Sequence, residues 1–278
     1  MRRAFAQVDV FADRPVAGNP VAVVRDGDGL DDASMAAFAR WTNLSETTFL
    51  QTPSVPGADF RLRIFTPGGE LPFAGHPTLG SVHAWLEGGG VPAGAAVVVE
   101  CGIGPVTVRR DSRGLAFAAP ELRRTGAVDF PTLVEIGTAL GLAPDEIVEA
   151  AWVDNGPPWI GLLLDSGRRV LDVEPDFAAL GSHMVGLVGP YAEADRDGVA
   201  IEVRAFAPGV GVPEDPVTGS LNAGLARWLR ASGRLPAEYT AAQGTAIGRA
   251  GRVRVVDDGT DIWIGGGTVT VIEGTVDL

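Results

Sequence analysis

The feature that most constrains the fold of this 278-residue chain is an internal repeat with a period of about half its length. Four spaced residues recur in the same order, each 141 residues later: Arg63, Phe65, Pro67 and Pro72 reappear as Arg204, Phe206, Pro208 and Pro213. The second copy then gains two residues, so that Trp85-Leu86 matches Trp228-Leu229 at a spacing of 143. Chance similarity in an Ala- and Gly-rich chain is the weaker explanation, and we predict two halves of one design.

Each half presents a polar loop directly before a short helix. The loops read ELPFAGHPTLG at 70–80 and EDPVTGS at 214–220. Because binding sites often form where two domains face each other, we expect both loops to contribute to one site between the halves.

The composition is typical of a globular protein, with 46% hydrophobic and 21% charged residues. The net charge of -13 argues against nucleic acid or an anionic membrane as a partner. The chain has no lysine, so its 22 basic residues are all arginine. A pyridoxal phosphate enzyme needs a lysine for its aldimine, and a P-loop needs a lysine to reach the phosphates, so both classes are excluded.

Cys101 is the only cysteine, which excludes an intrachain disulfide and a CxxC metal site and is compatible with a reducing cytosol. The N-terminal segment meets Asp9 before an adequate apolar stretch develops, so no signal peptide is predicted. No apolar run approaches the ~20 residues that a membrane-spanning helix requires. We therefore expect a cytoplasmic protein with no membrane partner.

Hydrophobic periodicity predicts an α+β fold. Alternating, strand-like segments dominate both halves, and each half has one central helix, over 78–86 and 220–229. The irregular segment 120–129 is the expected link, which gives an N-terminal domain of residues 1–120 and a C-terminal domain of residues 121–278. Because several strands follow one another for each helix, the sequence does not predict the alternating βαβ order of a parallel α/β fold.

Several familiar site motifs are incomplete. The Gly-Ile-Gly at 102–104 follows a strand, but another strand comes next, where a dinucleotide-binding fingerprint needs a helix. His76, His83 and His183 lack a metal-binding spacing, and there is no GxSxG nucleophile motif. We therefore expect no dinucleotide, no metal ion and no nucleophilic serine.

Two helix starts remain as binding candidates. Thr78 and its neighbours in the first half, and Gly219 and Ser220 in the second, are expected to offer backbone N–H groups at helix N-termini, which suit a carboxylate. Gly75 and Gly219 carry no side chain, so that a ligand can approach the backbone closely.

Three side chains are candidates for acid/base work. Glu46, in the alternating segment LSETTFL at 44–50, is either a buried catalytic carboxylate or half of a buried ion pair with an arginine. His76 stands just before the first helix, where it can polarise a substrate, although loop histidines are more often structural. Asp215 precedes a proline, and Asp-Pro is a common pair in turns and at helix starts.

At these residues the chain resembles the phenazine-biosynthesis PhzF-like family of isomerases. The matching segments occur in family order: VDVF at 8–11, GNP at 18–20, SETTF at 45–49, IFTPGGELPFAGHPTLG at 64–80 and EDPVTGS at 214–220. The resemblance implies the diaminopimelate-epimerase-like fold, with two pseudo-symmetric domains, each a curled, mostly antiparallel sheet or open barrel around a central helix. It also implies a site in the cleft, chemistry without a cofactor, and a homodimer.

The resemblance also assigns roles to residues. Glu46 matches the family's acid/base glutamate, and His76 and Asp215 match polar residues that contact the substrate and assist proton movement. Loop positions near the substrate are matched by Gly75, Gly219 and Ser220. The related epimerases use two cysteines at the helix starts, which this chain lacks.

We therefore expect a cofactor-independent isomerase that moves a proton within a small carboxylated metabolite, either cyclic or amino-acid-like. Glu46 is the expected proton carrier, because burial would raise its pKa toward neutrality. The alternative is a non-catalytic ligand-binding or scaffold protein on the same fold. Retention of Glu46, His76 and Asp215 together favours the enzyme.

Overall fold

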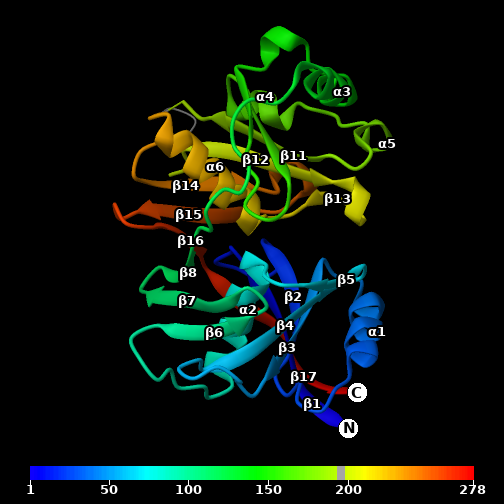
Figure 1. Ribbon diagram of the computed structural model, residues 1–278, viewed down its shortest axis with the longest axis vertical. Coiled ribbons are helices and arrows are strands. Elements are labelled where there is room, and N and C mark those ends of the chain that lie inside the picture. Colours follow the sequence, from blue (N-terminus) through cyan, green and yellow to red (C-terminus); the bar gives the residue numbers. More distant parts are fainter. Residues whose placement is uncertain (193–197) are drawn as a thin grey trace. The chain divides into compact units, whose positions relative to one another are not determined.

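The computed structural model describes residues 1–192 and 198–278. The chain divides into two compact units (Figure 1). Unit 1 consists of Met1–Ala118 and Gly265–Leu278, and unit 2 of Ala119–Ile264.

The first division between the units falls close to the expected boundary after residue 120. The end of the chain differs from the expectation, because Gly265–Leu278 belongs to unit 1 and not to the C-terminal half. The reason is strand β17 (Thr268–Asp277), which pairs antiparallel along the whole of β1 (Arg2–Val10). The ladder joins the two ends of the chain in one sheet.

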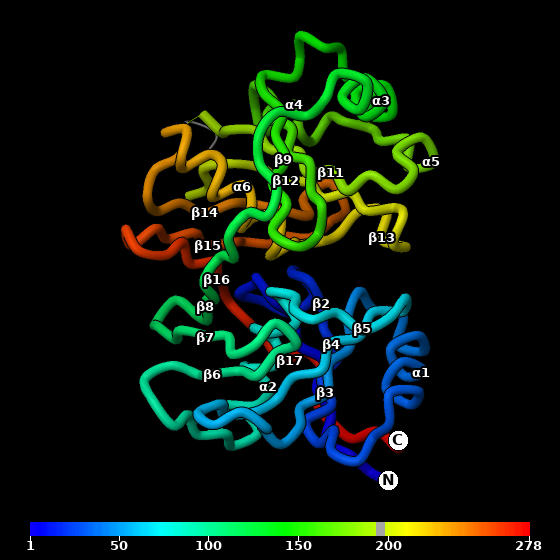
Figure 2. The backbone as a smooth tube through the Cα atoms, viewed as in Figure 1, coloured from blue at the N-terminus to red at the C-terminus, as the bar shows by residue number. Residues whose placement is uncertain are grey.

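Unit 1 is a curled sheet around a central helix. Its strands are β1, β2 (Asn19–Val24), β3 (Glu46–Gln51), β4 (Phe60–Thr66), β5 (Gly69–Leu71), β6 (Val97–Cys101), β7 (Gly104–Asp111), β8 (Gly114–Ala118) and β17. Pairing is antiparallel except for β2–β3 and β4–β6. The central helix α2 (Gly75–Glu87) packs against β1, β2, β3, β8 and β17 (Figure 2).

Unit 2 repeats this pattern with its own strands. They are β9 (Glu149–Trp152), β10 (Trp159–Leu163), β11 (Met184–Pro190), β12 (Ile201–Ala207), β13 (Val212–Asp215), β14 (Glu238–Gln243) and β15 (Gly251–Asp257), and β16 (Ile262–Gly266) leads the chain back toward unit 1. Pairing is antiparallel except for β10–β11 and β12–β14. The counterpart of α2 is α6 (Gly219–Ala231), which packs against β10 and β15.

The strand registers show which residues of the two units correspond. In unit 1, Thr47 lies opposite Phe65, and in unit 2, Val185 lies opposite Phe206. Phe65 and Phe206 are a pair of the sequence repeat, so the preceding residues of β3 and β11 correspond as well. Glu46 therefore has an apolar counterpart, the first residue of β11. By the neighbouring parallel ladders, Val21 of β2 corresponds to the first residue of β10. These two counterparts are Met184 and Trp159.

The central helices correspond over their full length, and this corrects one match in the repeat. Both have thirteen residues and begin with glycine. Trp85 is the eleventh residue of α2 but Trp228 is the tenth of α6, and one residue turns an α-helix by ~100°. Trp85 packs against the ring of Phe60 at 5.4 Å, whereas Trp228 donates a hydrogen bond to Glu149. The shared Trp-Leu is thus one position out of structural register.

Shorter helices complete each unit. In unit 1, α1 (Asp32–Thr42) is capped by Asp31 and buries Met35 and Phe38. In unit 2, Ile136 of α3 and Leu162 of β10 share one core. The helices that cover this core are α3 (Phe130–Leu140), α4 (Gly167–Leu171) and α5 (Phe177–Leu180). The described residues of unit 2 also form the 3₁₀ turns η1 (Pro144–Glu146), η3 (Pro208–Val210) and η4 (Thr245–Ile247). Because successive side chains of a strand point to opposite faces, Gly161, which lies under Leu225 of α6, faces away from this core.

None of the helices in the two described ranges has the length and apolar character needed to cross a bilayer.

Candidate active site

Glu46 and His76 meet in unit 1. Glu46 is the first residue of β3 and His76 the second residue of α2. The His76 Nε2 atom lies 3.3 Å from Oε2 of Glu46, and the two side chains are 5% and 15% exposed. The sheet and its central helix therefore bring a carboxyl group and an imidazole together in a nearly dry environment.

The imidazole of His76 is neutral at physiological pH. Burial lowers its pKa to about 3, although a hydrogen bond to the backbone of Pro20 opposes the shift. Across the described ranges, Nε2 makes no hydrogen bond, so Nδ1 is the nitrogen that donates to Pro20. In the Nδ1–H tautomer Nε2 carries no proton, and this nitrogen lies 3.3 Å from Oε2 of Glu46.

The first turn of α2 is used differently from the expectation. The helix begins at Gly75, three residues before Thr78, and the Thr78 N–H donates to Ala74 O at 3.2 Å. The Thr78 hydroxyl donates to the same carbonyl at 2.8 Å. Neither group is therefore available to a ligand, and the N–H groups without an intrahelical partner belong to Gly75 and His76, since Pro77 has none.

Gly75 has a packing reason for its identity. A Cβ atom at this position would overlap the ring of Phe117 in β8. Glycine is therefore required here for packing, whether or not a ligand approaches the start of α2.

The corresponding helix start in unit 2 carries Gly219 and Ser220. These are the first two residues of α6. The Ser220 hydroxyl accepts a hydrogen bond from Nε1 of Trp159 at 3.0 Å, and the Ser220 carbonyl accepts one from Nδ2 of Asn155 at 2.8 Å. Ser220 is half-buried, in contrast to the buried His76.

Asp215 belongs to a hydrogen-bond network beneath α6. Its Oδ2 atom accepts from the Thr218 hydroxyl at 2.5 Å, and that hydroxyl accepts from Nε2 of Gln243 at 2.9 Å. Oε1 of Gln243 in turn accepts from Thr218 N at 3.0 Å and from Asn222 Nδ2 at 2.8 Å. The N-cap residue of α6 is Thr218, so the network orients the Asp215 carboxylate without making it the cap.

Three residues of this surrounding structure carried no sequence signal. Gln243 comes from the end of β14, Asn155 lies in the turn between β9 and β10, and Trp159 is the first residue of β10. They are brought together by tertiary pairing between segments that are distant in sequence, which no local motif marks.

The single cysteine is not a catalytic thiolate. Burial raises the pKa of Cys101 to about 12, although a hydrogen bond with the Thr78 side chain opposes the shift. Over residues 1–192 and 198–278, no group of three or more His, Cys, Asp or Glu side chains is placed to hold a metal ion.

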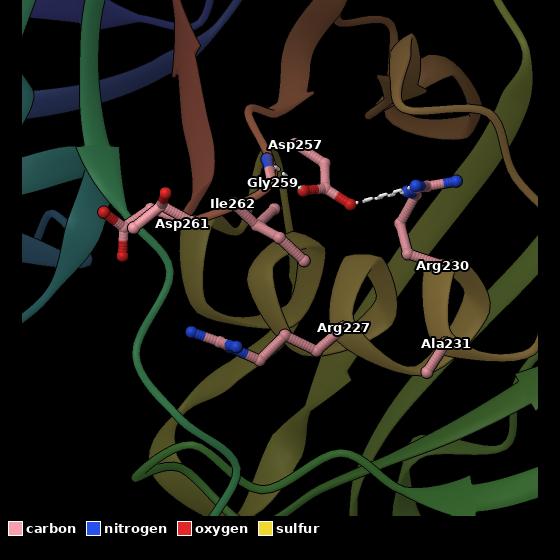
Figure 3. Close-up of a pocket in the computed structure, with 8 residues that line it drawn as sticks. Arg227, Arg230, Ala231, Asp257, Gly259, Asp261 and Ile262 are labelled. Atoms are coloured by element: carbon pink, nitrogen blue, oxygen red, sulfur yellow. Dashed lines mark hydrogen bonds and ion pairs between the residues drawn. The ribbon is translucent and has the colours of Figure 1, made fainter.

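A surface cavity of 310 Å³ in unit 2 lies away from the start of α6 (Figure 3). It is lined by the last turns of α6 and the turn before β16. Its arginines are engaged: Arg230 pairs with Asp257, and Arg227 donates to the carbonyl groups of Ala119 and Pro120. Arg227 is seven residues beyond Ser220, a rise of ~10 Å along the helix. The cavity is therefore not part of the candidate site.

Comparisons with known proteins identify the group to which this architecture belongs. The family described as phenazine biosynthesis-like protein (PhzC-PhzF) matches residues 8–274. A trans-2,3-dihydro-3-hydroxyanthranilate isomerase of Pseudomonas fluorescens is 33% identical over 98% of each chain. The protein antisense-enhancing sequence 1 of Schizosaccharomyces pombe is 34% identical over 98% of this chain and 97% of its own. A crystal structure of a PhzF-family protein from Enterococcus faecalis covers both chains fully, with 27% identity and a TM-score of 0.82. The predicted fold class is confirmed.

Proposed function

Because the chain belongs to the phenazine biosynthesis-like family and is an isomerase of the PhzF type, we propose that it moves a proton between two carbons of a small carboxylated metabolite without a cofactor. Glu46 carries the proton. His76 and Asp215 orient the substrate, and the first turn of α6 binds its carboxylate.

The contact between Glu46 and His76 is the observation that supports this proposal most. The unprotonated Nε2 of a neutral imidazole, 3.3 Å from Oε2 of Glu46, can accept a hydrogen bond but has no proton to supply. The group of this pair that can both give and take a proton is the carboxyl group. Proton transfer to and from carbon is therefore assigned to Glu46, and His76 orients the substrate beside it.

The substrate must offer a carbon acid beside a carboxylate. Backbone N–H groups at helix N-termini and the Ser220 hydroxyl are hydrogen-bond donors, which suits an anion. The name of the Pseudomonas fluorescens relative indicates a cyclic amino acid that bears a hydroxyl group. We propose a substrate of this class, from which Glu46 removes a proton at one ring carbon; its carboxyl group then exchanges that proton with solvent and protonates another ring carbon.

A non-catalytic role remains the second candidate, because the Schizosaccharomyces pombe relative carries a name that describes no isomerase. The two candidates differ in one measurable property. An enzyme of the proposed kind exchanges a substrate C–H with solvent, and a binding protein does not.

The test is incubation of the protein with trans-2,3-dihydro-3-hydroxyanthranilate in deuterated water, followed by NMR and mass spectrometry. The proposal predicts an isomerised product with one deuterium at the newly protonated carbon. A matched control is His183→Gln, which alters an exposed His–Glu pair in unit 2, with 3.5 Å between His183 and Glu135, and should exchange at the parent rate. Tight binding without isomerisation or exchange would favour the non-catalytic candidate.

A further inference from the structure

Ser220 is held through two hydrogen bonds by the turn between β9 and β10 and by the first residue of β10. Asn155 donates to its backbone carbonyl and Trp159 donates to its hydroxyl oxygen. The same turn packs against α6 one helical turn later, where a Cβ atom on Gly224 would overlap the carbonyl group of Val153. The start of α6 is thus seated on a preformed support.

The support is itself rigid. The Val153 N–H donates to Trp159 O at 2.9 Å, and the Trp159 N–H donates to Pro157 O at 2.8 Å. Trp159 is only 2% exposed, so its ring is fixed by packing on all sides. The indole N–H therefore has a defined direction, toward Ser220.

The chemistry of the two groups decides which of them donates in the hydrogen bond between Trp159 and Ser220. A serine hydroxyl can donate or accept, but an indole N–H can only donate. While Trp159 donates to it, the Ser220 hydroxyl proton must point elsewhere, and in the described part of the chain this hydroxyl has no other hydrogen bond. Its proton is left for a ligand.

We propose that Trp159 is a positioning residue that fixes the Ser220 hydroxyl as a hydrogen-bond donor, so that the start of α6 selects a carboxylate over a neutral carboxamide. This rests on the proposed function only in taking Ser220 as a contact of the substrate carboxylate. A carboxylate presents acceptors on both oxygens, whereas the NH₂ group of a carboxamide is a donor and would oppose the helix N–H groups and the Ser220 proton. Without Trp159 both lone pairs of the Ser220 oxygen could accept from that NH₂ group, whereas the Trp159 bond occupies one of them and restricts the other in direction.

Other tryptophans of unit 2 donate their indole N–H to carboxylates and not to a hydroxyl group. The indole of Trp263 donates to a carboxylate oxygen of Asp258 at 2.9 Å, and that of Trp228 to Glu149 at 3.1 Å. A carboxylate is an acceptor in any orientation, so these bonds fix no hydroxyl. Trp263, also buried, is therefore a matched control for the removal of an indole N–H.

The test measures binding of 3-hydroxyanthranilate and of its neutral analogue, 2-amino-3-hydroxybenzamide, by isothermal calorimetry. The proteins are the parent, Trp159→Phe, Ser220→Ala, the double variant, and Trp263→Phe. We expect the parent to prefer the carboxylate, and Trp159→Phe to reduce the ratio of the two affinities about tenfold, the effect typical of one hydrogen bond to a charged group. Trp263→Phe should leave the ratio unchanged.

The double variant separates positioning from packing. If Trp159 acts through the Ser220 hydroxyl, Trp159→Phe will not change the ratio further in the Ser220→Ala background. Additive effects, or an equal loss of affinity for both compounds, would overturn the proposal. Should Trp159→Phe fail to fold, benzothienylalanine at position 159 keeps the fused ring and replaces N–H by sulfur, and the same ratio is measured.

The outcomes also distinguish this inference from the proposed function. If the parent bound neither compound, the role of Ser220 as a carboxylate contact would fail, and the inference with it. If the ratio of the two affinities responded as expected but no substrate C–H exchanged, the role of the Ser220 hydroxyl as a donor would be supported and the proposed proton transfer would be overturned.

Discussion

The starts of α2 and α6 are equivalent positions of the two units, yet they carry different chemistry. Each helix begins with glycine, and the second residue is His76 in α2 and Ser220 in α6. His76 is buried and neutral beside Glu46, whereas Ser220 is half-buried and bonded by Trp159. The residue that corresponds to Glu46 in unit 2 is Met184, which cannot carry a proton.

This difference shows how a repeated fold can separate two tasks. The backbone frame, a helix start beside a parallel pair of strands, is the same in both units. In unit 1 the side chains at this frame are a carboxyl group and a neutral imidazole, and in unit 2 they form a set of hydrogen-bond donors. Under the proposed function, Glu46 of unit 1 carries the proton and Ser220 of unit 2 contacts the substrate carboxylate.

The largest effect is expected from Glu46→Gln. The amide keeps the shape of the side chain but cannot accept a proton from carbon, so kcat should fall by about 10²–10⁴-fold with little change in substrate affinity. Ser220→Ala should do the opposite, with a rise in KM and a smaller change in kcat. Steady-state kinetics of the two variants measure the split. A loss of kcat in both, or in neither, would contradict the separation of tasks.

A second contrast between the units concerns the arginines of the sequence repeat. Arg204 forms a two-fold hydrogen bond to Glu214 and lies 4.9 Å from the Phe206 ring. Arg63 forms the same bonds to Glu70 and lies 5.3 Å from the Phe65 ring. The pair in unit 2 is buried, at 5% and 7% exposure, while the pair in unit 1 is 15% and 40% exposed.

Burial should separate the two pairs in stability. Arg204→Met leaves a buried carboxylate without its partner and should cost about 3–5 kcal/mol. Arg63→Met leaves Glu70 in contact with water and should cost about 1 kcal/mol or less. Urea unfolding of both variants checks the difference, and equal losses would show that the two pairs are equivalent in energy as well as geometry.

The third prediction concerns the acid stability of unit 1. The unfolded chain protonates His76 near its ordinary pKa of 6.5, whereas burial lowers the pKa in the folded state to about 3. Between these pH values the unfolded state binds more protons, so stability should fall as the pH is lowered, by a few kcal/mol at most, roughly.

His76→Gln should remove that part of the acid destabilisation. His83, whose pKa burial also lowers, contributes in the same direction and remains in the variant. Thermal unfolding from pH 7 to pH 4 compares the parent, His76→Gln and the control His183→Gln. An unchanged pH dependence in His76→Gln would mean that the ring is not kept neutral by burial.

The smallest effect is expected from Cys101→Ser. The thiol is buried, and burial raises its pKa to about 12, so it does not act as a base at neutral pH. Turnover should stay within about twofold of the parent, and stability should fall by ~1 kcal/mol at most, since serine is a small change that Thr78 can still hydrogen-bond. A large loss of turnover in a folded variant would point to thiol chemistry.

The sequence was informative where residues act locally. The α+β class and the two related halves follow from periodicity and repeats, and the structure agrees with them. Glu46 and His76 stand in long motifs, so they could be named before their contact was known. The start of α2 was misplaced because Gly75 and Pro77 are poor helix formers, and packing against Phe117 overrides that preference.

Residues that act through tertiary contacts could not be found in this way. Trp159 and Gln243 reach the start of α6 only because β10 and β14 pair into the sheet of unit 2. The return of Gly265–Leu278 to unit 1 depends on a ladder with the first strand of the chain. Such pairings leave no local pattern in the sequence.

The central claim, that Glu46 carries the proton, is tested most directly by wash-in of solvent deuterium in single turnovers of trans-2,3-dihydro-3-hydroxyanthranilate. The parent and His183→Gln should place deuterium on the substrate carbon at the rate of turnover. Glu46→Gln should bind the compound and exchange at least about 10²-fold more slowly. Exchange at the parent rate in Glu46→Gln would mean that another residue is the base, and the assignment of proton transfer to the Glu46–His76 pair would be contradicted.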